Sequence, residues 1–316
     1  MIKLLRRLRT AQIRLTFRLL GGFERLPGGT RVLRCVAHWP LTAPILNALL
    51  GYLRVFESLR EAEVAARPYA EGGHQHPDYA VLHMSLSVVP RPSDYAALLH
   101  MRGMNLNRRK IFDFGGNIGN LFYLYDRYLK LPPDCTWLVF DLPVWVESGQ
   151  DVAANRGENR LRFTRKWEDA AGAELLIASG SLHYFDTPLS QMVSKLPEKP
   201  SHILINRTPL IDGSAKATVQ DGGIHRVACV LYNRTEFVTA LEAIGYEVVD
   251  TWKAWELSLK LVGKPEYSAL PYSGFFFRLK EQVPKRGGLD HDTTTETKDG
   301  LARPLRAGSI DAGTSQ

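Results

Sequence analysis

The stretch that decides the fold of this chain is Ile111-Phe112-Asp113-Phe114-Gly115-Gly116-Asn117-Ile118-Gly119. It reads as a buried apolar strand that ends beside an acid, followed by three glycines within five residues and then a helix. Glycine lets the backbone pass close to a ligand, and the first turn of a helix offers free N–H groups. The stretch therefore predicts a nucleotide-like cofactor bound where this strand turns into the helix.

The glycine spacing argues against a dinucleotide. The fingerprint G-x-G-x-x-G would need glycine at position 114, which is Phe114, and Asp113 would place a carboxylate beside the pyrophosphate. A cationic sulfonium cofactor with an amino-acid tail suits a nearby carboxylate better, because opposite charges attract. Asp141 ends the next predicted strand, 22 residues after Gly119. A ribose-binding acid follows such a loop at about this interval, roughly 20 residues.

From Lys110 to about Lys280, short apolar strands alternate with amphipathic helices, which is the pattern of a doubly wound sheet. Candidate strands lie at residues 110–114, 137–141, 161–164, 174–179, 202–206, 246–252, 255–261 and 274–279, the last two compatible with an antiparallel hairpin. Candidate helices lie at residues 121–129, 144–156, 187–196 and 235–244, with Thr235 as a cap. The prediction is an α/β fold with a Rossmann-like, doubly wound, mostly parallel seven-stranded sheet and a helical N-terminal cap.

Two motifs carry a family resemblance. Residues 113–119, D-F-G-G-N-I-G, resemble motif I of class I S-adenosylmethionine-dependent methyltransferases, and residues 140–143 resemble the F-D-L-P segment of the plant-type O-methyltransferase branch. Residues 181–185 and 205–210 are also similar to a bacterial group of methyltransferases linked to surface-polysaccharide loci. The resemblance covers about residues 109–280 and implies S-adenosylmethionine as cofactor. The cofactor-binding residues that we expect are Asp113, Gly115, Gly116, Asn117, Gly119, Asp141, Leu142 and Ser179.

The acceptor side of the site is expected after the fourth and fifth strands of this region. The segment S-L-H-Y-F-D is similar to the L-H-D-W-S-D segment of plant-type enzymes, in which the matching histidine is a general base, so His183 is the candidate base. A loop histidine with structural hydrogen bonds is the alternative. Asn206 and Arg207 are placed to contact the acceptor, although a structural ion pair would equally explain Arg207. Because no acid directly ends the strand at 161–164, Trp167 or Glu168 is the candidate for the adenine pocket.

Charge is concentrated at the N-terminus. The net charge is +7, and residues 1–20 hold six basic residues and no acid. Since the remainder is nearly neutral, a nucleic-acid partner is not expected. Apolar residues recur at helical spacing on one stripe: Leu4, Leu8, Ala11, Leu15 and Leu19. This predicts an amphipathic helix that either lies on an anionic membrane surface or packs on its own domain with its arginines solvated.

Other signals exclude several classes of protein. No run of about 18 apolar residues occurs, and arginines interrupt every apolar run near the N-terminus, so neither a spanning helix nor a cleaved signal peptide is expected. The three cysteines are widely spaced, which argues against a disulfide framework or a zinc site. His74 and His76 lack a third ligand in sight, so no metal is expected.

The chain divides into four expected regions. Residues 1–25 form the basic helix, 26–105 a helical cap or substrate region rich in prolines, 106–283 the S-adenosylmethionine-dependent methyltransferase domain, and 284–316 a disordered tail with almost no large apolar residues. We expect a cytoplasmic enzyme, with contact to the inner membrane face through residues 1–20 as one possibility, that methylates an oxygen of a sugar or other small-molecule acceptor. An NAD-dependent oxidoreductase and a noncatalytic, membrane-associated cofactor-binding protein are the alternatives. The sequence leaves the acceptor and the oligomeric state open.

Overall fold

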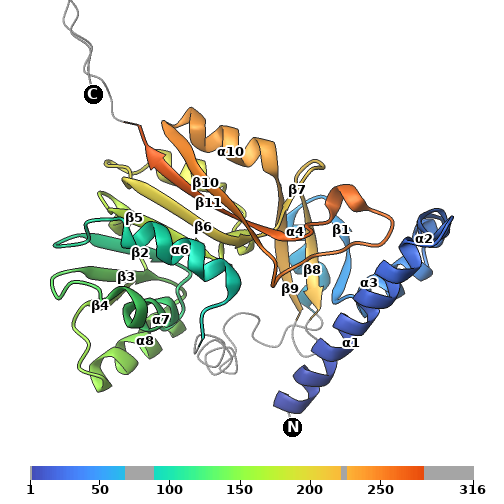
Figure 1. Ribbon diagram of the computed structural model, residues 1–316, viewed down its shortest axis with the longest axis horizontal. Helices are drawn as coiled ribbons and strands as arrows, with labels where there is room; N and C mark the ends of the chain where they lie inside the picture. Colours follow the sequence, from blue (N-terminus) through green and yellow to red (C-terminus); the bar gives the residue numbers. More distant parts are fainter. Residues whose placement is uncertain (1, 68–88, 222–225, 281–316) are drawn as a thin grey trace, which may run out of the picture. The chain divides into compact units, whose positions relative to one another are not determined.

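Seven strands form the central sheet, in the order β10-β11-β6-β5-β2-β3-β4 (Figure 1). The computed structural model describes residues 2–67, 89–221 and 226–280. His74, His76 and the region 284–316 lie outside these residues. The strands are β2 Lys110–Phe114, β3 Thr136–Phe140, β4 Leu161–Thr164, β5 Leu175–Ser179, β6 His202–Thr208, β10 Tyr246–Ala254 and β11 Tyr272–Leu279.

The direction and order of these strands decide where a ligand can bind. Strands β4, β3, β2, β5 and β6 are parallel, whereas β11 runs antiparallel to both β6 and β10. The chain moves outward from β2 to β3 and β4, then returns to the other side of β2 to form β5 and β6. This creates a topological switch point between β2 and β5, and ligands of open α/β sheets bind beyond the carboxyl ends of the strands at such a point. The predicted α/β class with a mostly parallel seven-stranded sheet is confirmed.

Alternate residues of the strands enter two cores, one on each face of the sheet. Ile111 and Leu175 pack against α6 (Pro92–Arg102), α7 (Asn120–Leu129) and α8 (Pro143–Asn155) on one face. Phe112 and Leu176 pack toward α9 (Leu189–Ser194) and α10 (Arg234–Ala243) on the other. Because both faces are covered, β5 is apolar without alternation, as the sequence predicted for residues 174–179.

A second, four-stranded sheet was not predicted. Its order is β1-β8-β9-β7, with bounds β1 Tyr52–Phe56, β7 Leu210–Ile211, β8 Lys216–Asp221 and β9 Arg226–Asn233. The helix α4, Leu59–Ala66, packs beside β8 and β9. The helical cap or substrate region predicted for residues 26–105 contains the helices α2 (Gly29–His38), α3 (Thr42–Leu49), α4 and α6, but it also contains the strand β1, which was not predicted. β1 pairs with β8, which lies about 160 residues further along the chain. A local sequence pattern cannot predict such a pairing.

The C-terminal strands also differ from the prediction. Residues 255–261 form no strand, and only Leu259 makes an isolated bridge, to Ala269. β10 and β11 instead pair directly and antiparallel from Tyr246 to Ala254. The expected hairpin between 255–261 and 274–279 is therefore wrong. Asn233 caps α10, because its side chain accepts a hydrogen bond from the N–H of Glu236.

Three helices precede the second sheet: α1 Ile2–Glu24, α2 Gly29–His38 and α3 Thr42–Leu49 (Figure 1). Phe17 and Leu20 of α1 pack against a small core formed by Leu33, Leu50 and Val262. None of the helices described here has the length and apolar character needed to cross a membrane. All three cysteines are free thiols.

Candidate functional site

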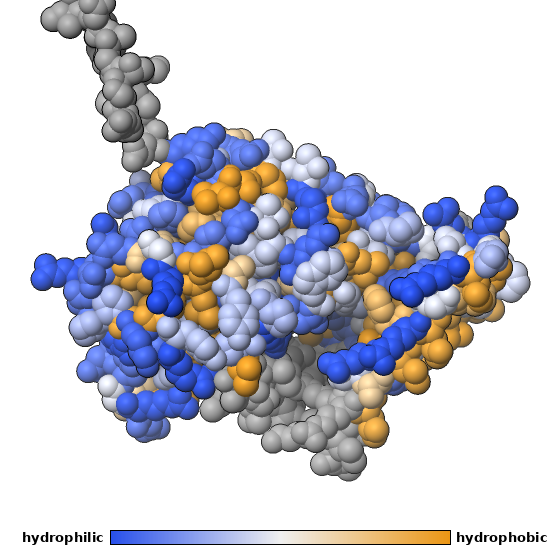
Figure 2. All heavy atoms as spheres, viewed as in Figure 1, coloured by the Kyte–Doolittle hydropathy of each residue, from blue (hydrophilic) through white to orange (hydrophobic). Residues whose placement is uncertain are grey.

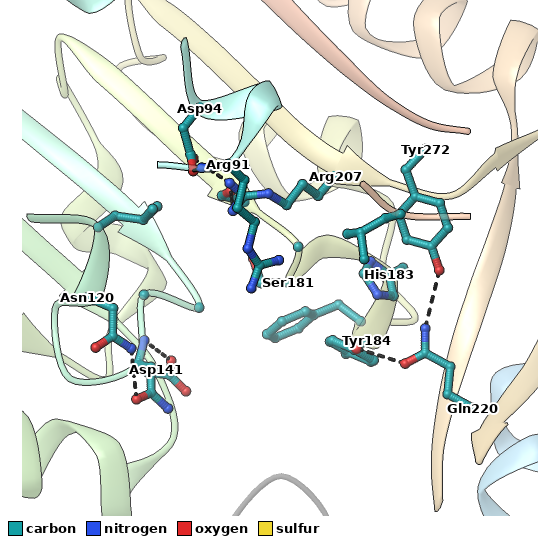
Figure 3. Close-up of a pocket in the computed structure, with 18 of the residues that line it drawn as sticks. Arg91, Asp94, Asn120, Asp141, Ser181, His183, Tyr184, Arg207, Gln220 and Tyr272 are labelled. Carbon is teal, nitrogen blue, oxygen red and sulfur yellow. Dashed lines mark hydrogen bonds and ion pairs between the residues drawn. The ribbon is translucent and has the colours of Figure 1, made fainter. Parts of the chain in front are cut away.

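A cavity of about 570 Å³ opens at the carboxyl ends of β2, β3, β5 and β6 (Figure 3). Its size is that of pockets which hold cofactors and small ligands. One end is lined by the turn after β2 and by Asp141, and the other by His183, Tyr184 and residues of the second sheet. The cavity thus lies at the switch point between β2 and β5 and extends to the second sheet.

The backbone of Gly115 and Gly116 forms part of the cavity wall. Gly115 has φ of +72°, and a Cβ atom there would lie 2.4 Å from the Cβ of Ser181. A Cβ atom on Gly116 would lie 2.4 Å from Oδ2 of Asp113. Larger residues are therefore excluded at both positions, and the bare backbone is available to a ligand.

Asp113 supports this turn from below and is absent from the cavity wall. Its side chain is 1% exposed and accepts a hydrogen bond of 2.9 Å from Nε1 of Trp137. Burial raises the pKa of Asp113 to about 7, partly opposed by the Trp137 hydrogen bond. The expected contact between Asp113 and the cofactor is therefore corrected: its carboxyl group packs under Gly116 and does not face the cavity.

The buried carboxyl of Asp113 makes stability depend on pH. Its pKa, raised to about 7 in the folded protein, exceeds its ordinary value near 4 in the unfolded chain, so its contribution to stability is greatest at low pH and is lost as pH rises through 7. Asp113→Asn retains an acceptor for Trp137 but cannot ionise. We therefore expect the unfolding free energy of the variant minus that of wild type to be larger at pH 8 than at pH 5, by on the order of 3 kcal/mol. Urea titrations at both pH values measure this difference, and a constant difference would contradict the expectation.

Asp141 follows β3 and faces the cavity (Figure 3). Its two carboxylate oxygens accept hydrogen bonds of 2.7 Å from the backbone N–H groups of Asn117 and Leu142. Burial raises the pKa of Asp141 to about 6, against the lowering effect of those two hydrogen bonds. A carboxylate has about four acceptor positions, so Asp141 retains capacity for the hydroxyl groups of a ligand.

Arg207 lines the cavity, but its guanidinium is held by protein groups. It forms ion pairs with Asp94 and, at 3.3 Å, with Glu256, and it donates hydrogen bonds of 3.1 Å to the hydroxyls of Ser93 and Ser179. Of the two interpretations left open for Arg207, the structure shows the ion pair. Ser179, expected at the cofactor, lies on the wall as a partner of this arginine.

Arg91 is not among the site residues predicted from the sequence. It precedes α6, and its guanidinium extends into the middle of the cavity (Figure 3). Burial, followed by the positive charge of Arg207, lowers the pKa of Arg91. It makes no ion pair with an acid in the described part of the chain. Pro92 suits the first turn of a helix, and this signal could have placed Arg91 at a helix start.

His183 lies on the short 3-10 helix η4, Leu182–Tyr184, and is 2% exposed. Its ring lies 4.1 Å from the ring of Tyr184 and 6.2 Å from that of Tyr272, measured between centroids. The hydroxyl of Tyr184 donates to Oε1 of Gln220 at 3.0 Å, and Nε2 of Gln220 donates to the hydroxyl of Tyr272 at 3.4 Å (Figure 3). This end of the cavity therefore combines aromatic faces with hydroxyl and amide groups, some of which come from the unpredicted sheet.

The structure brings most of the predicted site residues together. Those on the cavity wall are Gly115, Gly116, Asn117, Asp141, Leu142, Ser179, His183 and Arg207. Besides Asp113, two others lie off the wall. Gly119 begins α7 against Leu161, and Asn206 is buried, its side-chain oxygen accepting from Nε1 of Trp252.

The two candidates for the adenine pocket do not line the cavity either. Trp167 packs edge-on against Phe112 and Phe114, and its Nε1 donates to the carbonyl of Met192. Glu168 lies in the same 3-10 helix, η3, Trp167–Ala170. Within the described residues, no cluster of three or more His, Cys, Asp or Glu side chains could hold a metal ion.

Neither a protein-family model nor a curated protein sequence matches this chain. Solved structures with a similar fold include three methyltransferases. The 1,6-didemethyltoxoflavin-N1-methyltransferase of Burkholderia thailandensis, with S-adenosylhomocysteine bound, is 17% identical over 70% of this chain and 90% of its own, with a TM-score of 0.43. An S-adenosylmethionine-dependent methyltransferase of Clostridium acetobutylicum ATCC 824 is 9% identical over 65% and 98%, with a TM-score of 0.43.

The third is the magnesium protoporphyrin IX methyltransferase of Synechocystis PCC 6803, which is 14% identical over 63% of this chain and 84% of its own, with a TM-score of 0.40. At these identities the likeness describes the fold alone.

Proposed function

We propose that this protein binds S-adenosylmethionine and transfers its methyl group to an oxygen of a sugar or other small-molecule acceptor. The observation that carries the proposal is the pairing of the bare Gly115–Gly116 backbone with the Asp141 carboxylate at the switch point of a parallel sheet. A nucleoside fits this pair, because the carboxylate can accept from ribose hydroxyls while the glycine backbone allows close approach.

A cation in the cavity matches the methionyl tail of this cofactor. Arg91, which extends into the cavity, would bind the carboxylate of the methionyl tail. Arg207 is already neutralised by Asp94 and Glu256 and is not required for this role. Because Asp113 does not face the cavity, its charge gives no reason to exclude a pyrophosphate. What disfavours NAD is the side chain of Phe114, which occupies the first glycine position of the dinucleotide fingerprint.

Methyl transfer at this site needs little besides alignment. The acceptor oxygen would attack the methyl carbon in line with the sulfur, forming the C–O bond as the C–S bond breaks and leaving S-adenosylhomocysteine. Holding the reacting atoms in this geometry supplies much of the acceleration. The imidazole of His183, on the cavity wall, would accept the hydroxyl proton. The hydroxyls of Tyr184 and Tyr272 and the amide of Gln220, which line the same end of the cavity as His183, could hydrogen-bond a polyhydroxylated ring.

Calorimetric titration of the full chain tests the cofactor directly. We expect micromolar affinity for S-adenosylmethionine and S-adenosylhomocysteine and none for NAD. Binding of NAD alone would favour the oxidoreductase alternative, and failure of all three to bind a folded protein would reject the proposal. Binding of both sulfur nucleotides with no transfer to any hydroxylated acceptor would identify a noncatalytic cofactor-binding protein.

Replacing the candidate base separates its chemical role from a structural one. We expect His183→Ala to lower kcat for methyl transfer by about 100-fold or more, because no base then takes the proton from the substrate hydroxyl. The affinity for S-adenosylmethionine should be unchanged. Transfer of labelled methyl groups to a panel of sugars, with calorimetry alongside, measures both quantities. The matched control is His202→Ala, since His202 begins β6 at the end of the sheet opposite the cavity. Full turnover by His183→Ala would remove this residue from the mechanism.

A further inference from the structure

Exposed hydrophobic side chains gather on the N-terminal helices. Eighteen large hydrophobic residues of the described part of the chain are exposed, and ten of them lie between residues 8 and 49. These ten are Leu8, Leu15, Leu19, Phe23, Leu26, Val32, Trp39, Leu41, Ile45 and Leu49. In Figure 2 hydrophobic residues lie along the edge formed by α1 and α2, with long hydrophilic side chains projecting beside them. Exposed apolar side chains that gather in one part of a surface, rimmed by polar ones, mark an interaction site.

The helix α1 has two apolar faces, and its own domain covers only one of them. Phe17 and Leu20 pack inward against the core beneath α1. Leu8, Leu15 and Leu19 are 57%, 58% and 64% exposed, and their spacings of seven and four place them together on another face. Packing of α1 on its own domain therefore does not account for the apolar stripe that the sequence shows.

The charge around this surface is strongly positive. Residues 1–49 contain nine basic residues and a single acid, Glu24. That acid is already paired with Lys260. Arg14, Arg18 and Arg25 are exposed and make no ion pair with any acid in the described ranges. Apolar side chains flanked by solvated arginines are the composition of helices that lie in the interface of an anionic bilayer.

We propose that α1, α2 and α3 dock this protein on the surface of an anionic lipid bilayer. The leucine stripe of α1 and exposed residues such as Trp39 and Ile45 enter the interface, while the arginines contact lipid phosphates. A second copy of the chain is a poorer occupant, because it would bring two strongly positive surfaces together. The proposal does not depend on the methyl-donor site.

Vesicle co-sedimentation with the full chain tests this. We expect binding to phosphatidylcholine vesicles that contain phosphatidylglycerol at about a third of the lipid, and little binding to phosphatidylcholine alone. Raising the salt to about 0.5 M should weaken the binding, since the attraction is screened. Leu19→Ser and Arg18→Glu should each lower the partition coefficient about tenfold, by removing an inserted side chain and by reversing a charge near the phosphates.

Matched substitutions elsewhere make the test specific. Leu99 is 68% exposed, similar to Leu19, and lies on α6, as does the exposed Arg102. Leu99→Ser and Arg102→Glu should leave partitioning unchanged, and thermal unfolding should show that all four variants remain folded. Equal binding to both vesicle types, or equal losses in the variants and the controls, would overturn the proposal. A dimer in light scattering that Leu19→Ser dissociates would instead show that the surface joins two copies.

Discussion

Asp141→Ala is expected to weaken the affinity for S-adenosylmethionine by about 100-fold or more. The variant removes the carboxylate that would accept the ribose hydroxyls, and hydrogen bonds to a charged acceptor contribute about 1.5–3 kcal/mol each. It also frees the N–H groups of Asn117 and Leu142, which hold the turn in place. Calorimetric titration measures the loss. Asp151→Ala, at an exposed position of α8, is the matched control and should bind like wild type.

The pH dependence of binding gives an independent test of the same residue. Since the pKa of Asp141 is raised to about 6, the ligand-free carboxyl is protonated below this pH and must ionise before it can accept both hydroxyl groups. Affinity should be constant above pH 6 and fall toward tenfold per pH unit below it. The profile of Asp141→Ala should be flat in this range. A wild-type affinity that stays constant down to pH 5 would show that the ionised carboxylate does not hold the cofactor.

Arg207→Leu is expected to lower the free energy of unfolding by about 3–5 kcal/mol. Breaking a buried ion pair on one side leaves the other charge desolvated and unpaired, and here both Asp94, 1% exposed, and Glu256 would lose their cation. Urea unfolding measures the change. If Arg207 served mainly to bind the acceptor, the variant would keep its stability and lose only turnover, which would contradict the structural role.

Arg91→Leu is the contrasting variant. Because Arg91 makes no ion pair with a described acid, its replacement should change the unfolding free energy by less than about 1 kcal/mol. It should nevertheless weaken binding of S-adenosylmethionine, while binding of 5′-methylthioadenosine, which lacks the methionyl tail, stays unchanged. Equal losses for both ligands would place Arg91 away from the tail.

The second sheet contributes to the end of the cavity where we propose that the acceptor binds. Strand β8 supplies Gln220, and the residues after α3 supply Gly51 and Tyr52. The opposite end, where we propose that the cofactor binds, is built from the turns that follow β2 and β3. Because part of the proposed acceptor end comes from the second sheet, this end can differ between proteins that share the central sheet, which is why function has to be argued from the site and not from the fold.

The sequence was sufficient to predict the parallel strands of the central sheet and the turns that line one end of the cavity. These depend on local signals: apolar strands of four to seven residues, glycines wherever a Cβ atom would clash, and an acid at a strand end. The structure confirms that each predicted strand from β2 to β6 exists, and Gly115, Gly116 and Asp141 meet at one edge because the carboxyl ends of parallel strands do.

The remaining features could not be predicted from the sequence, because they depend on contacts between distant segments and on the direction in which each side chain points. The pairing of β1 with β8 joins segments about 160 residues apart. Two positions close together at the end of β2 also differ in their surroundings. Asp113 is buried beneath the turn, whereas Gly115 lines the cavity. Periodicity likewise predicted that α1 is amphipathic. Helical spacing is the same for an apolar face that is buried and for one that meets solvent. Only the packing therefore shows which apolar face of α1 the domain covers.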